Sequence, residues 1–100
     1  MNPLLSHVDV VDVVNSGRFG GLDNVSYARI VEQLGEPNVQ DDPTKVDASW
    51  AVQHEDGRVL CVWNYKNGQA YLGKDGVPVE DILFWSYGGD KSLANELFGA

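Results

Sequence analysis

The strongest constraint on the fold is an alternation of apolar and polar residues that begins at Lys45. One side of this segment carries Val46, Ala48, Trp50 and Val52. A period of two is typical of a half-buried β-strand. The following Glu55-Asp56-Gly57 predicts a tight turn, with glycine where the backbone needs a positive φ. We therefore expect a β-hairpin to begin here.

The returning strand continues the alternation. One face carries Val59, Cys61, Trp63 and Tyr65, and the other carries Leu60, Val62 and Asn64. Asn67-Gly68 is a strong signal for a second hairpin turn, so residues 69–72 are predicted as a third strand. Residues 81–87 read as a fourth strand, apolar enough to be covered on both faces. The prediction is a four-stranded antiparallel meander with its first and fourth strands as sheet edges.

Helical spacing dominates before the sheet. Residues 3–15 are predicted as a helix, although their valines would also suit a strand. The glycine-rich segment Gly17–Asn24 is interpreted as a turn and not as a phosphate loop, because its spacing does not fit one. A second helix, capped by Asp23 or Asn24, carries an apolar stripe and ends at Gly35. Asp90 is expected to cap a last short helix.

These elements predict an α+β fold, with two N-terminal helices, the meander, and a short C-terminal helix packed on one sheet face. One hundred residues suit a single domain, 1–100, divided into a helical part (3–35), a sheet (45–88) and a final helix (90–98). The expected core is made of large apolar side chains from both layers: Tyr27, Ile30, Leu34, Trp50, Cys61, Trp63, Leu83 and Trp85.

Composition limits the partners. The net charge of −8 is spread along the chain and would repel phosphate backbones and anionic membranes. Direct binding to nucleic acid or to a membrane is therefore not expected. The N-terminal residues lack the basic region of a secretory signal, and a single cysteine allows no internal disulfide. We expect a cytoplasmic protein.

No residue pattern predicts catalysis. His7, His54 and Cys61 do not have metal-ligand spacing, and Cys61 reads as a core residue rather than a nucleophile. The carboxylate pairs, of which Glu80-Asp81 is one, lie in predicted turns where water keeps both acids ionised. We therefore predict no catalytic residues, no metal and no cofactor. An enzyme with a pocket beside the sheet is a minor alternative.

A set of short motifs within residues 45–89 resembles a pattern found in small uncharacterised bacteriophage and prophage proteins. The motifs are Lys45-Val46, Trp50, Asp56-Gly57, WNYKNGQAYLG, VEDI and Trp85-Ser86-Tyr87-Gly88-Gly89. That pattern commonly has a histidine after the last tryptophan, where this chain has Ser86, so a histidine-dependent function is not expected. The resemblance implies a phage or prophage origin and brings no activity with it.

The expected function is inhibition of a host or defence protein by direct contact, with a partner that offers a basic surface. The acidic candidates could imitate nucleic acid around the first hairpin: Asp41, Asp42, Asp47, Glu55 and Asp56. Tyr65, Lys66 and Tyr71 could meet a partner near the second hairpin tip. One alternative is an immunity-type protein that neutralises a basic toxin. Another is a self-assembling phage accessory protein that pairs through sheet edges. A monomer or a homodimer is expected.

Overall fold

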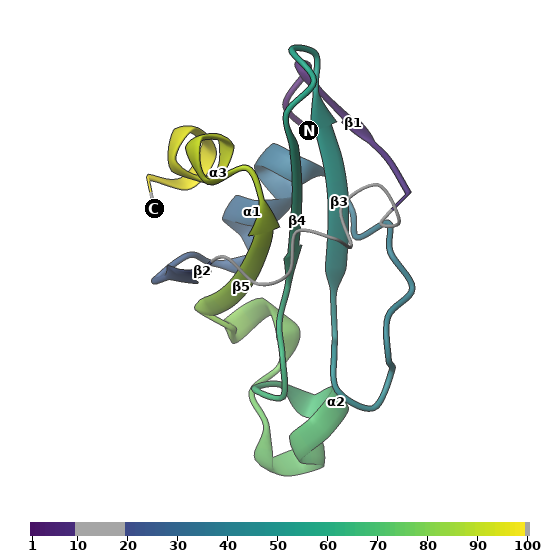
Figure 1. Cartoon of the computed structure of the whole chain (residues 1–100). Coiled ribbons are helices and arrows are strands. Elements are labelled where there is room, and N and C mark those ends of the chain that lie inside the picture. Colours follow the sequence, from purple (N-terminus) through teal and green to yellow (C-terminus); the bar gives the residue numbers. More distant parts are fainter. Residues whose placement is uncertain (10–19, 100) are drawn as a thin grey trace.

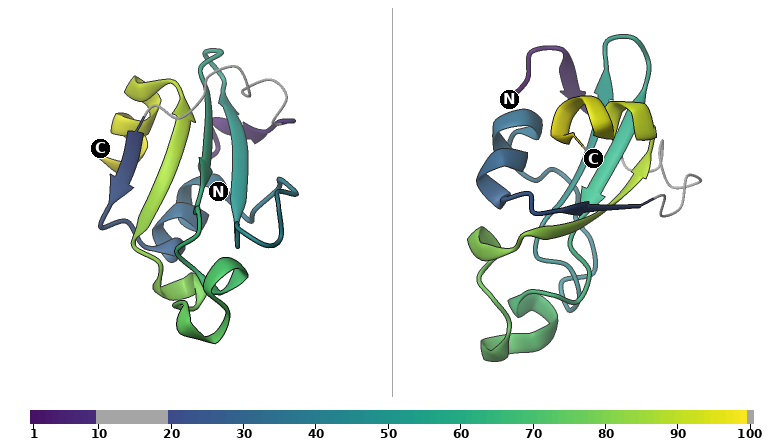
Figure 2. Two further views of the ribbon diagram at one scale, coloured as in Figure 1. Left: turned by 60° about the horizontal axis from the view of Figure 1, so that its bottom comes forward. Right: turned by 90° about the vertical axis from the view of Figure 1, so that its left-hand side faces the viewer.

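The computed structural model describes residues 1–9 and 20–99. Its fold is α+β, as predicted, with a five-stranded antiparallel sheet in the order β1-β3-β4-β5-β2. The strands are β1 (Leu5–His7), β2 (Gly20–Asp23), β3 (Ser49–His54), β4 (Val59–Trp63) and β5 (Phe84–Gly89). Helices α1 (Tyr27–Leu34) and α3 (Lys91–Phe98) lie on the same side of this sheet (Figures 1 and 2).

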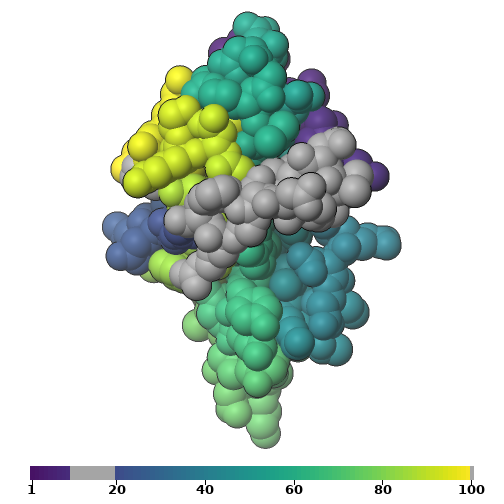
Figure 3. All heavy atoms as spheres, viewed as in Figure 1, coloured from purple at the N-terminus to yellow at the C-terminus, as the bar shows by residue number. Residues whose placement is uncertain are grey.

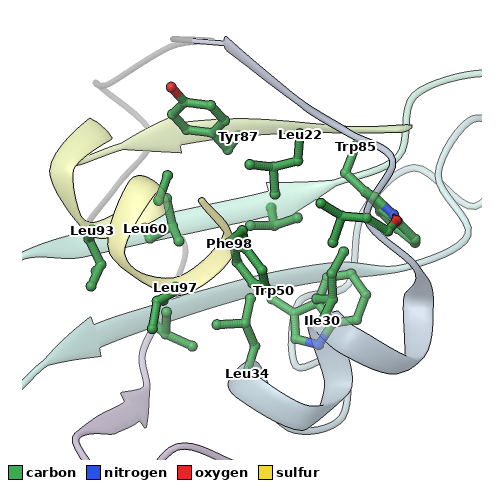
Figure 4. Packing of buried hydrophobic residues seen from close by; sticks show 14 of the residues in the cluster. Leu22, Ile30, Leu34, Trp50, Leu60, Trp85, Tyr87, Leu93, Leu97 and Phe98 are labelled. Atoms are coloured by element: carbon green, nitrogen blue, oxygen red, sulfur yellow. The ribbon is translucent and has the colours of Figure 1, made fainter. Parts of the chain in front are cut away.

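The core lies between this sheet face and the two helices (Figure 4). Trp50 and Trp85 are fully buried at its centre, with their rings edge to face and 5.4 Å apart. The indole N–H of Trp50 donates to the carbonyl of Gly35, and that of Trp85 donates to the carbonyl of Val25. These carbonyls flank α1 on either side, so the two tryptophans tie both ends of the helix to the sheet while satisfying their own polar atoms.

Both helices end where the sequence indicated, whereas α1 begins later than predicted. Asp90 caps α3 as predicted, because its carboxylate accepts from the Leu93 N–H. The cap of α1 is Ser26, which accepts from Arg29 N–H, and not Asp23 or Asn24. Gly35 ends α1 with a φ of 76°, the positive value for which glycine was expected.

The prediction of a helix over residues 3–15 is wrong in the part that the structure describes. Leu5–His7 is strand β1, which pairs with β3 in the register Leu5↔His54. Pairing with the edge of β3 favours a strand over a helix here, since it satisfies backbone groups of both strands. The rest of the predicted helix lies outside the described residues.

The glycine-rich segment contains a strand rather than only a turn. Gly20 and Gly21 open β2, which pairs with β5. A Cβ at Gly20 would lie 2.9 Å from the Tyr87 ring, and one at Gly21 would lie 2.5 Å from the Phe84 ring. Glycine is therefore required because aromatic rings of β5 lie against this backbone, and not because the chain turns here.

The first predicted hairpin is confirmed, but its core face was assigned to the wrong side of β4. Strands β3 and β4 pair across the Glu55–Gly57 turn, and Gly57 has a φ of 99°. Leu60 and Val62 belong to the main core. Cys61 is buried on the opposite face with Ala51, and Trp63 is only partly buried there.

The second predicted hairpin does not exist. A type I′ turn would need positive φ at both Asn67 and Gly68, but Gly68 has a φ of −121° and opens helix α2 (Gln69–Leu72). The predicted third strand is thus a helix, and the last strand begins only at Phe84. Leu83, expected in the core, is 50% exposed. The outer strands are β1 and β2, so neither of the predicted edges is an edge.

Candidate functional site

The most unusual segment is the connection between β4 and β5. These strands are antiparallel neighbours, which a two-residue turn could join. The chain instead uses residues 64–83, twenty residues that we call the excursion. It contains α2 and two short 3-10 turns, Gly73–Asp75 and Val79–Asp81. It forms the end of the molecule opposite the β3–β4 hairpin, the lower tip in Figure 3.

Asn64 fixes the start of the excursion. Its side chain is fully buried, and its oxygen accepts from the backbone N–H groups of Asp47 (2.8 Å) and Ala48 (3.0 Å). Its amide nitrogen donates to the Asp47 carboxylate (2.7 Å) and to the Asn67 side-chain oxygen (3.1 Å). All four hydrogen-bonding positions of the amide are filled, so this side chain can adopt only one orientation.

Asp47 extends this network into α2. Its second carboxylate oxygen accepts from the N–H of Ala70, in the first turn of the helix, at 3.0 Å. It therefore performs the role of an N-cap from a distant part of the chain, while the local residue, Gly68, has no side chain that could do so. The amide of Asn67 donates to the carbonyl of Phe84, which ties the excursion to the strand that follows it.

Two glycines allow the excursion to fold tightly. A Cβ on Gly68 would lie 2.2 Å from the Asp47 carboxylate, and a Cβ on Gly76 would lie 2.5 Å from the Gly68 carbonyl. Gly68 and Val77 form a parallel β-bridge at this crossing. The excursion is thus held by backbone approach and hydrogen bonds at its base.

Most of the exposed large apolar side chains of the described residues lie in the excursion or directly after it. Eight large apolar side chains are exposed in the described part of the chain, and six of them lie between residues 65 and 84. They are Tyr65, Tyr71, Leu72, Val77, Leu83 and Phe84. Clustering of exposed aromatic and aliphatic side chains in one segment is a feature of protein contact sites, whereas single exposed side chains need no explanation.

The three predicted contact residues of this region are brought together. The Lys66 ammonium lies 5.1 Å from the centre of the Tyr65 ring and 5.0 Å from that of Tyr71. We call these three residues the tyrosine clamp. Both distances are within the range of a cation–π contact. The backbone of Lys66 has a φ of 61°, a conformation that residues other than glycine seldom adopt. Its N–H donates to the carbonyl of Lys45.

The predicted acidic residues do not form one surface. Asp41 and Asp42 are exposed in the loop before β3, where hydrogen bonds from Thr44 lower the pKa of Asp42. Asp41 and Asp47 line an open pocket of about 440 Å³ together with Val39, Gln40, Pro43, Val46, Ala48 and Ser49. Asp47 is occupied in the network of Asn64, so its role is structural.

Glu55 and Asp56 lie at the far end of the molecule, at the tip of the β3–β4 hairpin (Figure 1). Hydrogen bonds from Arg58 lower the pKa of Asp56 to about 2. Arg58 also contacts Glu96 at 3.1 Å, which links the hairpin to α3. Asp41 and Asp42 precede β3 and Glu55 and Asp56 follow it, so the length of this strand separates the two acidic groups.

The side chains of both histidines and of the cysteine each contact a backbone group of the fold. His7 Nε2 lies 2.6 Å from the carbonyl of Leu34, and His54 Nδ1 accepts from the N–H of Asp56. Burial raises the pKa of the Cys61 thiol, which donates to the carbonyl of Gly88. No group of three or more potential metal ligands occurs among residues 1–9 and 20–99.

No helix in the described part of the chain has the length and apolar character needed to cross a membrane.

Sequence reasoning identified Tyr65, Lys66 and Tyr71 but not the residues that position them. Asn64 was recognisable as a polar residue on the Leu60–Val62 face of a strand, where an apolar residue would be expected. Leu72 and Val77 gave no such signal, because exposure of an apolar side chain depends on the path of the excursion. No protein-family model, no curated protein and no solved structure matches this chain.

Proposed function

We propose that this protein is a small inhibitor that binds a bacterial protein by direct contact, and that the excursion is its contact surface. The observation that carries the proposal is the concentration of exposed apolar side chains between Tyr65 and Phe84. Burying Tyr71 and Leu72 against a partner would remove apolar area from water, the main favourable term in association. We further propose that the protein comes from a phage or prophage and acts in the bacterial cytoplasm.

The fixed conformation of the excursion also supports binding. A loop that is already ordered loses little conformational entropy when it binds, so more of its contact energy appears as affinity. Asn64 and Asp47 supply this order from inside the fold. Imitation of nucleic acid has less support, since β3 separates Asp41 and Asp42 from Glu55 and Asp56.

A pair of matched variants tests the contact surface. Leu72 and Leu4 are each 43% exposed, but Leu72 is on the excursion and Leu4 lies before β1. Wild type, Leu72→Ser and Leu4→Ser would be immobilised, and bacterial proteins captured on each would be quantified. We expect at least one partner that Leu4→Ser retains and that Leu72→Ser binds about tenfold more weakly.

The captured partner would then be assayed for its own activity with and without the protein. Loss of activity that wild type and Leu4→Ser cause, and that Leu72→Ser does not, is the expected result. Partners that bind all three proteins equally would contradict a contact through the excursion. A partner whose activity is unchanged when bound would contradict inhibition.

A further inference from the structure

The tyrosine clamp presents a cation that no carboxylate in the described part of the chain neutralises. Lys66 is half-buried, its ammonium lies over both rings, and no carboxylate of the described residues forms an ion pair with it. Arg29, Lys74 and Lys91 likewise form no ion pair with a described carboxylate, so what distinguishes Lys66 is its place over two aromatic rings. Arg58, in contrast, binds two carboxylates, and Lys45 lies 3.9 Å from Asp42.

The Lys66 ammonium lies over both tyrosine rings. The faces of two aromatic rings attract it electrostatically, but a ring face accepts no conventional hydrogen bond from it. An ammonium has three donors and no acceptor, so donors remain that face away from the rings. The left-handed backbone of Lys66 is unfavourable for a residue with a side chain and persists because the surrounding structure imposes it.

We infer that the tyrosine clamp recognises a carboxylate of the partner, an aspartate or glutamate side chain next to an apolar residue. This inference rests on the proposed function and names the chemistry of the bound segment. The carboxylate would accept from Lys66, and the neighbouring apolar side chain would pack on Tyr71 and Leu72, which are 51% and 43% exposed. Ordering the lysine in advance reduces the entropy that a surface ion pair normally loses.

A peptide carboxylate fits this surface better than a phosphate chain does. The net charge of −8 repels a polyanion over many contacts, whereas a single carboxylate on a protein segment carries one charge. The excursion also offers apolar area around the cation, which a nucleic acid backbone would not use. The inferred ligand is therefore a short protein segment with one acid among apolar residues.

The test uses peptides selected from a yeast-displayed random library on the 100-residue chain. Fluorescence anisotropy would measure the affinity of each selected peptide and of the same peptide with its acid changed to the amide. We expect the acid-to-amide change to weaken binding to wild type about fivefold. The same change should have no effect on binding to Lys66→Met, which keeps an unbranched side chain at this backbone position.

Two further variants control the measurement. Lys74→Met removes an exposed lysine elsewhere on the excursion and should behave as wild type. Lys66→Arg keeps the charge and should retain the preference for the acid. Selected peptides that need Leu72 but bind equally well as acid and amide would overturn the inference and leave the proposed contact surface intact. Selected peptides that bind Leu72→Ser as tightly as wild type would instead overturn the contact surface, and the inference with it.

Discussion

Replacing Asn64 by alanine tests whether the excursion is held by its polar base. Asn64 is the one polar side chain among the largest fully buried residues in the described part of the chain. The substitution removes four hydrogen bonds in one step. It leaves the backbone N–H groups of Asp47 and Ala48 without their acceptor, and the Asp47 carboxylate without one of its donors.

The expected loss follows from these orphaned groups. A buried polar group that loses its partner costs about 1–3 kcal/mol, and the Ala48 N–H is in a buried position. The Asp47 N–H is only partly buried, so water can replace part of its bond. The cavity left by the amide adds to the cost of these unsatisfied groups. We therefore expect Asn64→Ala to lower the free energy of unfolding by about 3–5 kcal/mol. Small domains have about 5–15 kcal/mol in total, so the variant would be close to unfolded.

Urea unfolding followed by tryptophan fluorescence measures this loss, because Trp50 and Trp85 are fully buried. Asn95→Ala is the matched control, since Asn95 is exposed on α3 and alanine favours a helix. It should change stability by less than about 0.5 kcal/mol. Hydrogen exchange at Ala70 gives a second readout, because the N–H of Ala70 depends on Asp47, which Asn64 positions.

A loss below about 1 kcal/mol for Asn64→Ala would refute the reasoning, because one buried unsatisfied N–H alone should cost that much. Unchanged protection of the Ala70 amide would refute the narrower claim that Asn64 orders α2. Both readouts use the same protein sample, so a local effect on the excursion can be separated from global unfolding.

Three further outcomes follow from the geometry. Gly76→Ala should lower the free energy of unfolding, measured in urea, by at least about 2 kcal/mol, because the added Cβ would meet the backbone of Gly68. Gly73→Ala should lower it by only about 1 kcal/mol, because the space there is open and only the φ of 60° is unfavourable. Equal losses for the two variants would contradict this reasoning. Asp56→Asn should be less stable than wild type near neutral pH, and the difference should vanish as the pH falls from about 4 to about 2. The pKa of Asp56 is lower in the folded than in the unfolded protein, so the ionised carboxylate stabilises the fold fully only above its unfolded pKa. A difference in stability that persists at the lowest pH would contradict this reasoning. The Cys61 thiol should react with a thiol reagent on the order of 100-fold more slowly in the folded protein than in concentrated urea, and equal rates would show that it is accessible.

The parts of the fold that the sequence predicted are those in which local pattern and tertiary structure agree. The stripe of α1 and the cap of α3 are local signals, and both are confirmed. The alternation around the Glu55–Gly57 turn gave the β3–β4 hairpin for the same reason. It did not say which face of β4 meets the helices, because both faces carry apolar residues and the choice depends on the whole sheet.

The errors arise where distant residues decide the structure. Asn67-Gly68 favours a hairpin in isolation, but Asn64 and Phe84 bind the Asn67 side chain and Asp47 caps the helix that follows. The residues of α2 could therefore be predicted as strand even though each local signal was read correctly. The tyrosine clamp was found only as three nearby residues of suitable type, and its geometry depends on that same helix.

The way in which the excursion is held explains why its apolar side chains remain exposed. Within residues 64–83 only Asn64, Gly68 and Ile82 are buried. Apolar burial therefore contributes little to fixing this segment, and hydrogen bonds between Asn64, Asp47 and Ala70 do so instead. A segment held by its own apolar side chains would have to hide them from any partner. Polar fixation at the base leaves Tyr71 and Leu72 available, so order and an exposed contact surface occur together, as a preorganised binding site requires.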